Sequence, residues 1–393
     1  MHSIRRSCQA ALRSSSEACI FINGSRRGFS ISSARSKGAL PVFLTPSNSE
    51  LSSLLSTFNS KVLLPYHLTK EQQELVYRIA NKAKLEAEPV DITLGDVTLP
   101  LEHINRVRLP KRWQTFKQIV TKSETRDDWE NVVRALEGFQ NAGIEVKTDW
   151  KEMVVRHLNS NGMQHLVLKA LQRPKATGLS MREERLLLTV LRGIHDMAAL
   201  ADWDEEQTSK ALRWAKQVAE LLEEEDHHAT QSRGELASEK DLRGKPAVVA
   251  VPTEMAAVLA DRYGGSVEDV KVLVGRLVAA LKQDDYSSSL DNIIESCNKT
   301  SADFTSRASQ QSHTSTLAYI LLEPIFVYNA LKNARKVLGD DMPMKEEAQQ
   351  WESRTETVLN EAAKAADRLR TRDGDTIRTG FVENLKDALK QVQ

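Results

Sequence analysis

The chain has 393 residues, of which 40% are hydrophobic and 27% charged, with 54 basic side chains balanced by 54 acidic ones. This length allows one large domain or two to three ordinary ones. The balanced charge excludes a globally basic nucleic-acid-binding protein, so any such role needs a local patch. Of the three cysteines only Cys297 lies beyond residue 19, which excludes an internal disulfide or a multi-cysteine metal site in the body of the chain.

The first 36 residues have the composition of a mitochondrial transit peptide. They contain six Arg and ten Ser against one acid, Glu17. Arg- and Ser-rich, acid-poor N-termini are typical of such peptides, and a disordered basic tail is the alternative. Removing this segment leaves 48 basic against 53 acidic side chains, a net charge of about −5. The expected location is the mitochondrial matrix, free or at the surface of the inner membrane.

Inside this segment, RGFSIS (27–32) resembles the two-step processing motif of matrix presequences. The resemblance implies a first cut two residues after Arg27. An octapeptide that opens with Phe29 and has Ser32 at its fourth position is then removed. Lys37 would be the first mature residue.

The next segments, 37–99, are predicted to form an irregular lead-in that ends in one small hairpin. Residues 37–70 are rich in Ser and Leu without firm periodicity. VDITLGDVTL (90–99) alternates apolar and polar residues on both sides of Gly95-Asp96, the pattern of a β-hairpin.

Nearly everything after residue 99 is predicted to be helical. Apolar residues recur at three-four spacing in 129–139, 211–222, 270–281 and 351–369. Ser180 and Glu183 match a capping box, and Ser266 is expected to cap a helix. LAYILLEPIFVYNAL (317–331) is interrupted by Glu323 and Pro324, which predicts a buried helix with a break rather than a membrane span.

The predicted organisation is an all-α fold in two blocks. A transit peptide (1–36) and the lead-in (37–99) precede a block of stacked, solenoid-like helical hairpins (100–226). A polar linker (227–247) then leads to a C-terminal helical block (248–393).

One internal repeat supports the hairpin array. VVRALEGFQNAGIEV (132–146) and VLKALQRPKATGLSM (167–181) align at a shift of 35 residues, which places Gly143 over Gly178. Gly162 lies between two predicted short helices, 149–159 and 163–172. This order of helix, glycine turn, helix and glycine-apolar step resembles the pentatricopeptide repeat, a helical hairpin.

The resemblance covers residues 114–183 and lacks the usual Pro-Asp after the closing glycine. It implies a concave surface with single-stranded RNA as the partner. A generic array of helical hairpins is the alternative. Left-handed backbone at Gly143 and Gly178 would make either Gly→Val change cost on the order of 1 kcal/mol or more. Gly138, inside a predicted helix, is expected to accept Ala with a gain of up to about 1 kcal/mol.

The stretch 106–126 is the predicted RNA-binding segment. Its basic residues face one acid, Glu124, and two aromatic residues interleave with them: Arg106, Arg108, Lys111, Arg112, Trp113, Phe116, Lys117, Lys122 and Arg126. Cations hold phosphates while aromatic rings stack on bases, which is how single strands are held without base-edge readout. A solvated helix face with Trp113 in the core is the alternative.

No catalytic motif supports an enzyme, and no cofactor or metal is predicted. Phosphate-binding loops, G-x-S-x-G and H-E-x-x-H are absent from the sequence. EEEDHH (223–228) has metal-capable side chains in one solvated run that does not converge on a point.

The expected function is therefore non-catalytic action in mitochondrial gene expression, through mitochondrial RNA or the mitoribosome. Residues 101–193 carry 17 basic against 11 acidic side chains, whereas 194–264 carry 8 against 15. The acidic region and the C-terminal helices are expected to meet protein partners. The alternative is a helical adaptor with protein partners only: an assembly factor, or an accessory subunit of a respiratory complex or of the mitoribosome.

Overall fold

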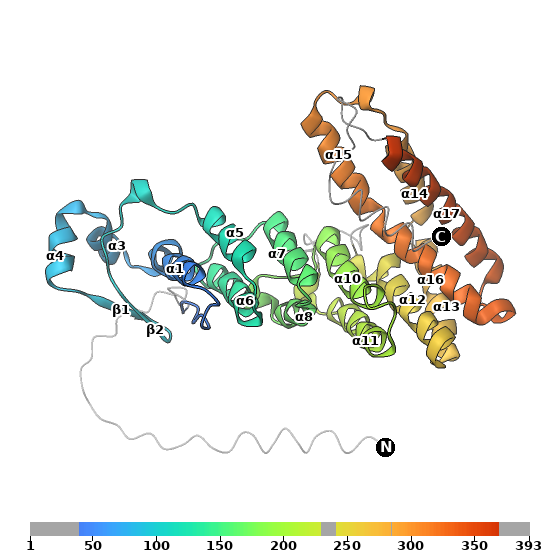
Figure 1. The fold of residues 1–393 in the computed structure, drawn as a ribbon, viewed down its shortest axis with the longest axis horizontal. Coiled ribbons are helices and arrows are strands. Elements are labelled where there is room, and N and C mark those ends of the chain that lie inside the picture. The colour runs from blue at the N-terminus through green and yellow to red at the C-terminus, as the bar shows by residue number, and fades with distance from the viewer. Residues whose placement is uncertain (1–38, 229–240, 284, 369–393) are drawn as a thin grey trace, which may run out of the picture. The chain divides into compact units, whose positions relative to one another are not determined.

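The computed structural model describes residues 39–228, 241–283 and 285–368. These residues are predominantly helical and include one two-stranded sheet (Figure 1). The all-α fold and the small hairpin predicted from the sequence are confirmed. The residues of the predicted processing motif, Arg27, Phe29, Ser32 and Lys37, lie outside the described part of the chain. Within that part, no helix combines the length and apolar character that crossing a membrane would need.

The N-terminal residues from 49 to 87 are mostly helical, so the predicted irregular lead-in was wrong. α1 (Ser49–Thr57) begins at Asn48, whose side chain accepts the Leu51 N–H, and runs through a π-helical segment (Phe58–Leu63) into α2 (Leu64–His67). α3 (Lys70–Tyr77) and α4 (Lys82–Ala87) follow. The helices form because four apolar side chains spaced three to five residues apart are buried on one side: Leu51, Leu55, Phe58 and Leu63.

The hairpin of β1 (Asp91–Leu94) and β2 (Val97–Pro100) is antiparallel, with Leu94 opposite Val97. Gly95 makes its turn with a φ of +66°, a conformation that glycine adopts without steric cost. The Leu94 carbonyl accepts the backbone N–H of Leu40 at 3.3 Å, so the start of the described chain is joined to this hairpin.

Residues 39–47 form an extended segment along α6 (Arg126–Asn141), which we call the N-terminal strap. Polar side chains of α6 bind its backbone: Asp128 accepts from Ser47, Asn131 both accepts from and donates to Leu44, Arg134 donates to Val42 and Asn141 donates to Ala39. The strap also passes over Gly138, where an added Cβ would lie 2.6 Å from Leu63 Cδ1 and 3.0 Å from Pro41 Cγ. The face of α6 that looks solvated in the sequence is therefore a binding surface for the chain itself.

This packing corrects the expectation that Gly138 accepts Ala. We expect Gly138→Ala to lower the free energy of unfolding by about 1–3 kcal/mol, because the methyl group overpacks Leu63 and, in the strap, Pro41. Gly275 is the matched control, since it also lies inside a helix but has nothing within 4 Å of an added Cβ. Gly275→Ala should be neutral or stabilising by up to about 1 kcal/mol. Urea unfolding of both variants measures the difference, and equal effects would contradict the close approach of the strap.

Three helical hairpins stack after the strap, as the sequence predicted. They are α5 (Arg112–Lys122) with α6, α7 (Thr148–Ser160) with α8 (Gln164–Leu171), and α10 (Glu184–Ala199) with α11 (Glu205–Leu221). A short α9 (Pro174–Thr177) follows α8 and packs on α6. α7 packs on α10 and α8 on α11, so each hairpin buries the apolar face of the next.

Glycine closes the turns at the predicted positions. Gly143, Gly162 and Gly178 have φ values of +68°, +73° and +69°. After α6 and α7 the bonding is that of a helix C-cap, in which Ile144 N–H reaches the Phe139 carbonyl. The third hairpin uses left-handed Asp202 and Trp203 instead (φ 52° and 58°). The predicted Ser180–Glu183 capping box is absent: the N-cap of α10 is Glu183, and its side chain makes no capping hydrogen bond.

The C-terminal helices surround α12 (Pro246–Tyr263), which packs on α11, α13 (Val267–Gln283) and α16 (Leu322–Leu338). α14 (Tyr286–Asn298), α15 (Arg307–Ile320) and α17 (Lys345–Arg368) complete the described residues. The predicted break falls at Leu321, between α15 and α16, and Ser266 accepts the Asp269 N–H at the start of α13. The predicted linker lies mostly in 229–240, outside the described residues.

A buried ion pair joins α10 to α12. His195 Nε2 lies 3.3 Å from Glu254 Oε2, and both side chains are at most 5% exposed. Burial by itself lowers the pKa of His195, but the Glu254 carboxylate outweighs burial, with help from Asp196, and raises it to about 10. The rings of Trp203 and Phe326 pack on the imidazole. The pair therefore carries a protonated histidine between the hairpin array and the central helix of the C-terminal block.

Candidate nucleic-acid interface

The predicted RNA-binding stretch begins in a short 3₁₀ turn (Arg106–Arg108) and follows α5 to the start of α6. Arg106 is exposed, and so are four further cations, Arg108, Lys111, Lys117 and Arg126. Within residues 39–228, 241–283 and 285–368, none of these four has a carboxylate partner within ion-pair distance. They are therefore available to a phosphate backbone.

The other three cations of the stretch already have partners. Lys122 Nζ lies 2.8 Å from a carboxylate oxygen of Glu50. The guanidinium groups of Arg106 and Arg112 lie against tyrosine rings. The stretch therefore divides into free cations, one ion-paired lysine and two arginines that are held by aromatic contacts.

Phe116 belongs to the core, which corrects the stacking role predicted for it. Its side chain is 0% exposed and packs edge-to-face on Phe139. Trp113 is half-buried in the same cluster and lies parallel to Trp150, with ring centroids 5.2 Å apart. Phe116 has no face to offer a base, and Trp113 keeps only a partly exposed ring. Trp150 was not singled out by sequence reasoning, because only the fold brings it to Trp113.

Further cations extend the basic surface across neighbouring helices. Burial lowers the pKa of His157 on α7, and the nearby charges of Arg156 and Lys117 lower it further. Burial likewise lowers the pKa of His165 at the start of α8, with Arg126 and then Lys210 adding to the effect. Lys117 comes from α5 and Lys210 from α11, so positive charge gathers from several helices around these two imidazoles.

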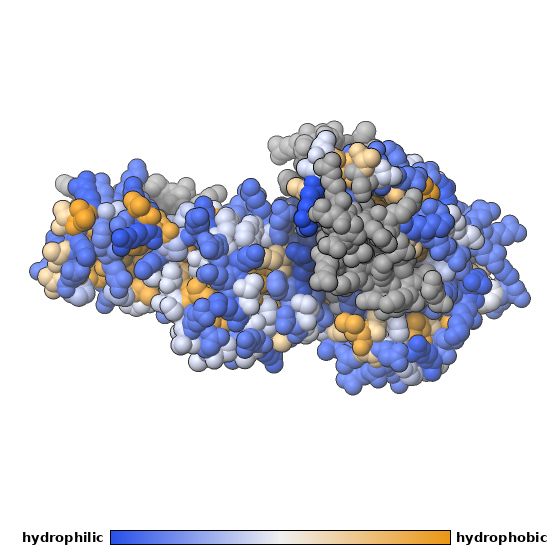
Figure 2. All heavy atoms as spheres, turned by 45° about the horizontal axis from the view of Figure 1, so that its top comes forward, coloured by the Kyte–Doolittle hydropathy of each residue, from blue (hydrophilic) through white to orange (hydrophobic). Residues whose placement is uncertain are grey.

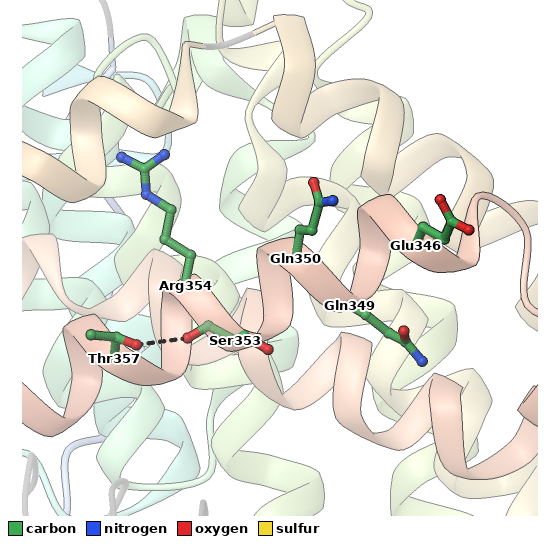
Figure 3. Close-up of a pocket in the computed structure, with 6 residues that line it drawn as sticks. All are labelled: Glu346, Gln349, Gln350, Ser353, Arg354 and Thr357. Carbon is green, nitrogen blue, oxygen red and sulfur yellow. Dashed lines mark hydrogen bonds between the residues drawn. The ribbon is translucent and has the colours of Figure 1, made fainter.

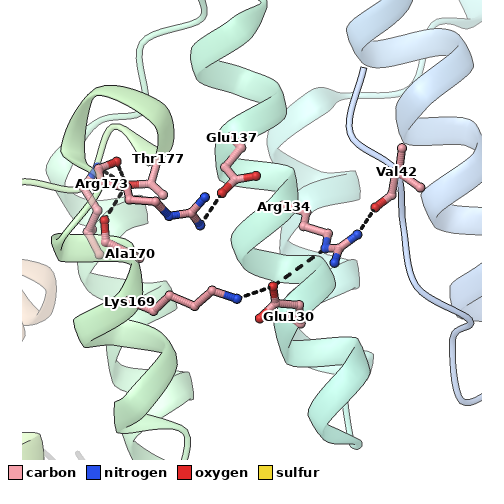
Figure 4. Close-up of polar contacts among 9 residues, drawn as sticks. Val42, Glu130, Arg134, Glu137, Lys169, Ala170, Arg173 and Thr177 are labelled. Carbon is pink, nitrogen blue, oxygen red and sulfur yellow. Dashed lines mark hydrogen bonds and ion pairs between the residues drawn. The ribbon is translucent and has the colours of Figure 1, made fainter. Parts of the chain in front are cut away.

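Two basic residues of the second repeat copy, in contrast, already have carboxylate partners. Lys169 Nζ lies 2.8 Å from Glu130 Oε1, and Arg173 Nη2 lies 2.7 Å from Glu137 Oε1, as Figure 4 shows. Both acids come from α6, so these ion pairs tie α8 and its following turn to the first hairpin. Their charges are compensated inside the protein. Charge counts along the sequence could not separate these cations from the free ones.

In the acidic run EEEDHH (223–228), which follows α11, the buried His227 has a structural role. His227 is 2% exposed; its Nδ1 accepts the Met181 N–H at 3.1 Å and its Nε2 donates to the Leu171 carbonyl at 3.0 Å. His227 thus fixes the loop after α9 to the end of α11. Across the described ranges, no group of three or more His, Cys, Asp or Glu side chains is placed to hold a metal ion.

An open pocket on α17 has no arrangement suited to catalysis. Its lining side chains come from one face of that helix: Glu346, Gln349, Gln350, Ser353, Arg354 and Thr357 (Figure 3). Arg354 is bound to α14, at 2.6 Å from Ser287 Oγ and 2.8 Å from Asp291 Oδ1. The lining therefore consists of amides, hydroxyls, the ion-paired Arg354 and the exposed Glu346, without a nucleophile beside a base.

A family model described as mitochondrial ribosomal protein mS27 matches residues 27–385 of the chain. The chain belongs to the mS27 family. It is also 24% identical over 313 residues to the small ribosomal subunit protein mS27 of Neurospora crassa, a match that covers 76% of this chain and 77% of that protein.

The mS27 match includes the basic stretch, the three stacked hairpins and the C-terminal helices. A family described as mitochondrial and ribosomal agrees with the mitochondrial destination predicted from the first 36 residues.

Proposed function

We propose that this mS27-family chain is a non-catalytic subunit of the small subunit of the mitoribosome, located in the mitochondrial matrix and delivered there by its N-terminal segment. The observation that supports this most is the family match over residues 27–385. The stacked hairpins add an extended surface of the kind that holds long partners.

The finer proposal is that the chain binds RNA through Lys111, Lys117 and Arg126. These cations are exposed and without carboxylate partners in the described part of the chain. Lys117 lies near His157 and Arg126 near His165, so both belong to the positive charge that gathers there. Phosphates are the groups that such cations bind, and each contact releases condensed counterions, so binding should weaken steeply with salt.

Changing Lys111, Lys117 and Arg126 together to Gln tests this face. We expect weaker RNA binding across sequences and a salt dependence flatter by roughly two units, about 0.7 for each lost phosphate contact on a single strand. The matched control changes Lys122, Arg173 and Lys175 to Gln, which removes the same charge from residues already paired with carboxylates. Fluorescence anisotropy with labelled RNA at several salt concentrations measures both slopes.

Equal slopes for the two triple variants would assign the RNA affinity to overall charge and contradict this face. If the wild-type chain bound no RNA at low salt yet co-sedimented with the small subunit, the adaptor alternative would apply. The region 194–264, with 8 basic against 15 acidic residues, is where we propose protein partners bind in either case.

We also propose that the first two hairpins are degenerate pentatricopeptide repeats. The left-handed Gly143 and Gly178, which lie 35 residues apart in the sequence, support this register. The second copy departs from the first because its second helix is interrupted at Arg173-Pro174, giving α8 and α9 in place of one continuous helix.

A further inference from the structure

A surface beside the free cations combines two tyrosines with two arginines. Tyr66 on α2 is 48% exposed, and its hydroxyl accepts an N–H of Arg112 at 3.1 Å. The Arg112 guanidinium carbon lies 5.8 Å from the centre of the Tyr66 ring. Tyr77, the last residue of α3, has the Arg106 guanidinium 4.2 Å above its ring centre. Each ring is thus covered by an arginine from a distant part of the sequence.

The helices that carry the two tyrosines are joined by hydrogen bonds. Gln73 Nε2 on α3 donates to the carbonyls of Pro65 and Leu68, at 3.2 and 3.3 Å, and so holds α3 against the end of α2. The segment that carries Arg106 is fixed to the end of α3, because the Ile104 N–H donates to the Val76 carbonyl at 3.0 Å. We call Tyr66, Tyr77, Arg106 and Arg112 the tyrosine–arginine surface.

Two solvent-exposed apolar side chains flank the tyrosine–arginine surface. Val107, between Arg106 and Arg108, is 94% exposed, and Ile79, two residues after Tyr77, is 79% exposed. On the face drawn in Figure 2, hydrophobic residues gather over the N-terminal helices among hydrophilic ones. These exposed side chains are available to pack against a ligand that binds beside them.

The side chains of the tyrosine–arginine surface indicate which kind of ligand it binds. Among the described residues, Arg106 and Arg112 have no carboxylate partner. Arg112 donates one N–H to the Tyr66 hydroxyl, and its other N–H groups and those of Arg106 are available to a ligand. Planar guanidinium and phenol groups stack on nucleobases, and guanidinium N–H groups bind phosphates. A base paired inside a duplex hides both of its faces, whereas an unpaired base exposes them.

We propose that the tyrosine–arginine surface binds unpaired nucleotides of RNA, with one base stacking on the exposed Tyr66 ring, a second on the exposed Arg106 guanidinium that covers Tyr77, and phosphates contacting the N–H groups of Arg106 and Arg112. This inference rests on the proposed RNA-binding function and assigns base stacking to residues other than Trp113 and Phe116. The free cations along α5 hold the continuing backbone. The chain therefore prefers a single-stranded segment to a duplex.

The test uses the full chain with two probes, a fluorescent 12-nucleotide oligouridylate and a 12-base-pair RNA duplex. Tyr66→Ala should weaken oligouridylate binding by about 5- to 150-fold, the range expected for one lost stacking contact, with the salt slope unchanged. Tyr66→Phe keeps the ring and should stay near wild type. It controls for the loss of the hydroxyl, which is the group that binds Arg112. The duplex should bind more weakly and be insensitive to Tyr66→Ala.

Three results would overturn the inference. In the first, Tyr66→Ala binds oligouridylate like wild type while the Lys111, Lys117 and Arg126 variant loses affinity. That result would agree with the proposed RNA-binding function and contradict base stacking at the tyrosine–arginine surface. Equal wild-type affinity for both probes would also exclude it. A photo-crosslinker placed at Val107 that joined a protein instead of rRNA in assembled small subunits would assign the surface to a protein partner.

Discussion

Glu254→Leu is expected to lower the free energy of unfolding by about 3–5 kcal/mol at neutral pH, because it removes the main partner of the buried His195 and leaves only the partly exposed Asp196 beside the imidazole. The two side chains are 3.3 Å apart and at most 5% exposed, so water cannot replace the lost partner. The change should destabilise α10 and the C-terminal block together, since the pair is a buried charged contact between α10 and α12. Chemical unfolding followed by circular dichroism measures the loss.

The effect should depend on pH in a defined direction. The pKa of His195 is raised from 6.5 to about 10, so the folded protein binds a proton that the unfolded chain releases between these values. The stabilisation from the pair is therefore fully present below pH 6.5 and is lost as the pH rises through 10. The gap between wild type and Glu254→Leu should narrow over that window.

A double variant distinguishes a broken pair from a badly packed site. His195→Leu with Glu254→Leu replaces both charges by apolar groups, which is often neutral or even stabilising for buried ion pairs. We expect it to recover most of the stability that Glu254→Leu loses. If the double variant were as unstable as the single one, loss of packing around Trp203 and Phe326 would explain the effect, and the charge argument would fail.

Local patterns were enough to predict much of the hairpin array. The apolar stripe of 129–139 gave α6, and the glycine-apolar steps gave left-handed turns at Gly143 and Gly178. Both features depend on residues that are neighbours in the sequence. The same local reasoning failed for residues 49–63, where exposed serines between the buried leucines obscured the helical spacing.

The candidate interface was only partly predictable because its chemistry depends on distant partners. An aromatic residue within a basic stretch can stack on a base or enter the core, and only the packing of Phe139 against Phe116 decides. A count of charges along the sequence treats Lys169 and Lys117 as equivalent cations, although the charge of Lys169 is compensated by an ion pair with Glu130. No local sequence pattern could have predicted the contacts of Tyr66 and Tyr77, since the arginines that they contact lie about 30 to 50 residues later in the chain.

The strap was missed for a related reason. Asp128, Asn131 and Arg134 on α6 have the spacing of a solvated polar face, but Asp128 and Asn131 are buried. Their partners lie more than 80 residues earlier in the chain. A polar helix face that binds extended backbone leaves no periodic signature in the strap itself, because the contacts use main-chain groups of any residue type.

Asp128→Ala is expected to lower the free energy of unfolding by about 2–4 kcal/mol, because one buried carboxylate serves both the strap and the helix start. It accepts the N–H groups of Ser47 at 3.0 Å, Thr125 at 3.0 Å and Glu124 at 3.2 Å. Truncation leaves three donors without their acceptor. Hydrogen exchange should show faster exchange of the Ser47 and Leu44 amides, and urea unfolding gives the energy.

The pH dependence and a neighbouring control make the test specific. Burial raises the pKa of Asp128, but the N–H groups of Thr125 and Ser47 outweigh burial and hold it at about 2, below the ordinary 3.8. The stabilisation is present above pH 3.8 and is lost as the pH falls through about 2, so the variant should approach wild type there. Asp127→Ala removes an exposed acid from the same helical turn and should cost less than about 1 kcal/mol. Similar losses at positions 127 and 128, with the Ser47 amide still protected, would show that α6 does not hold the strap.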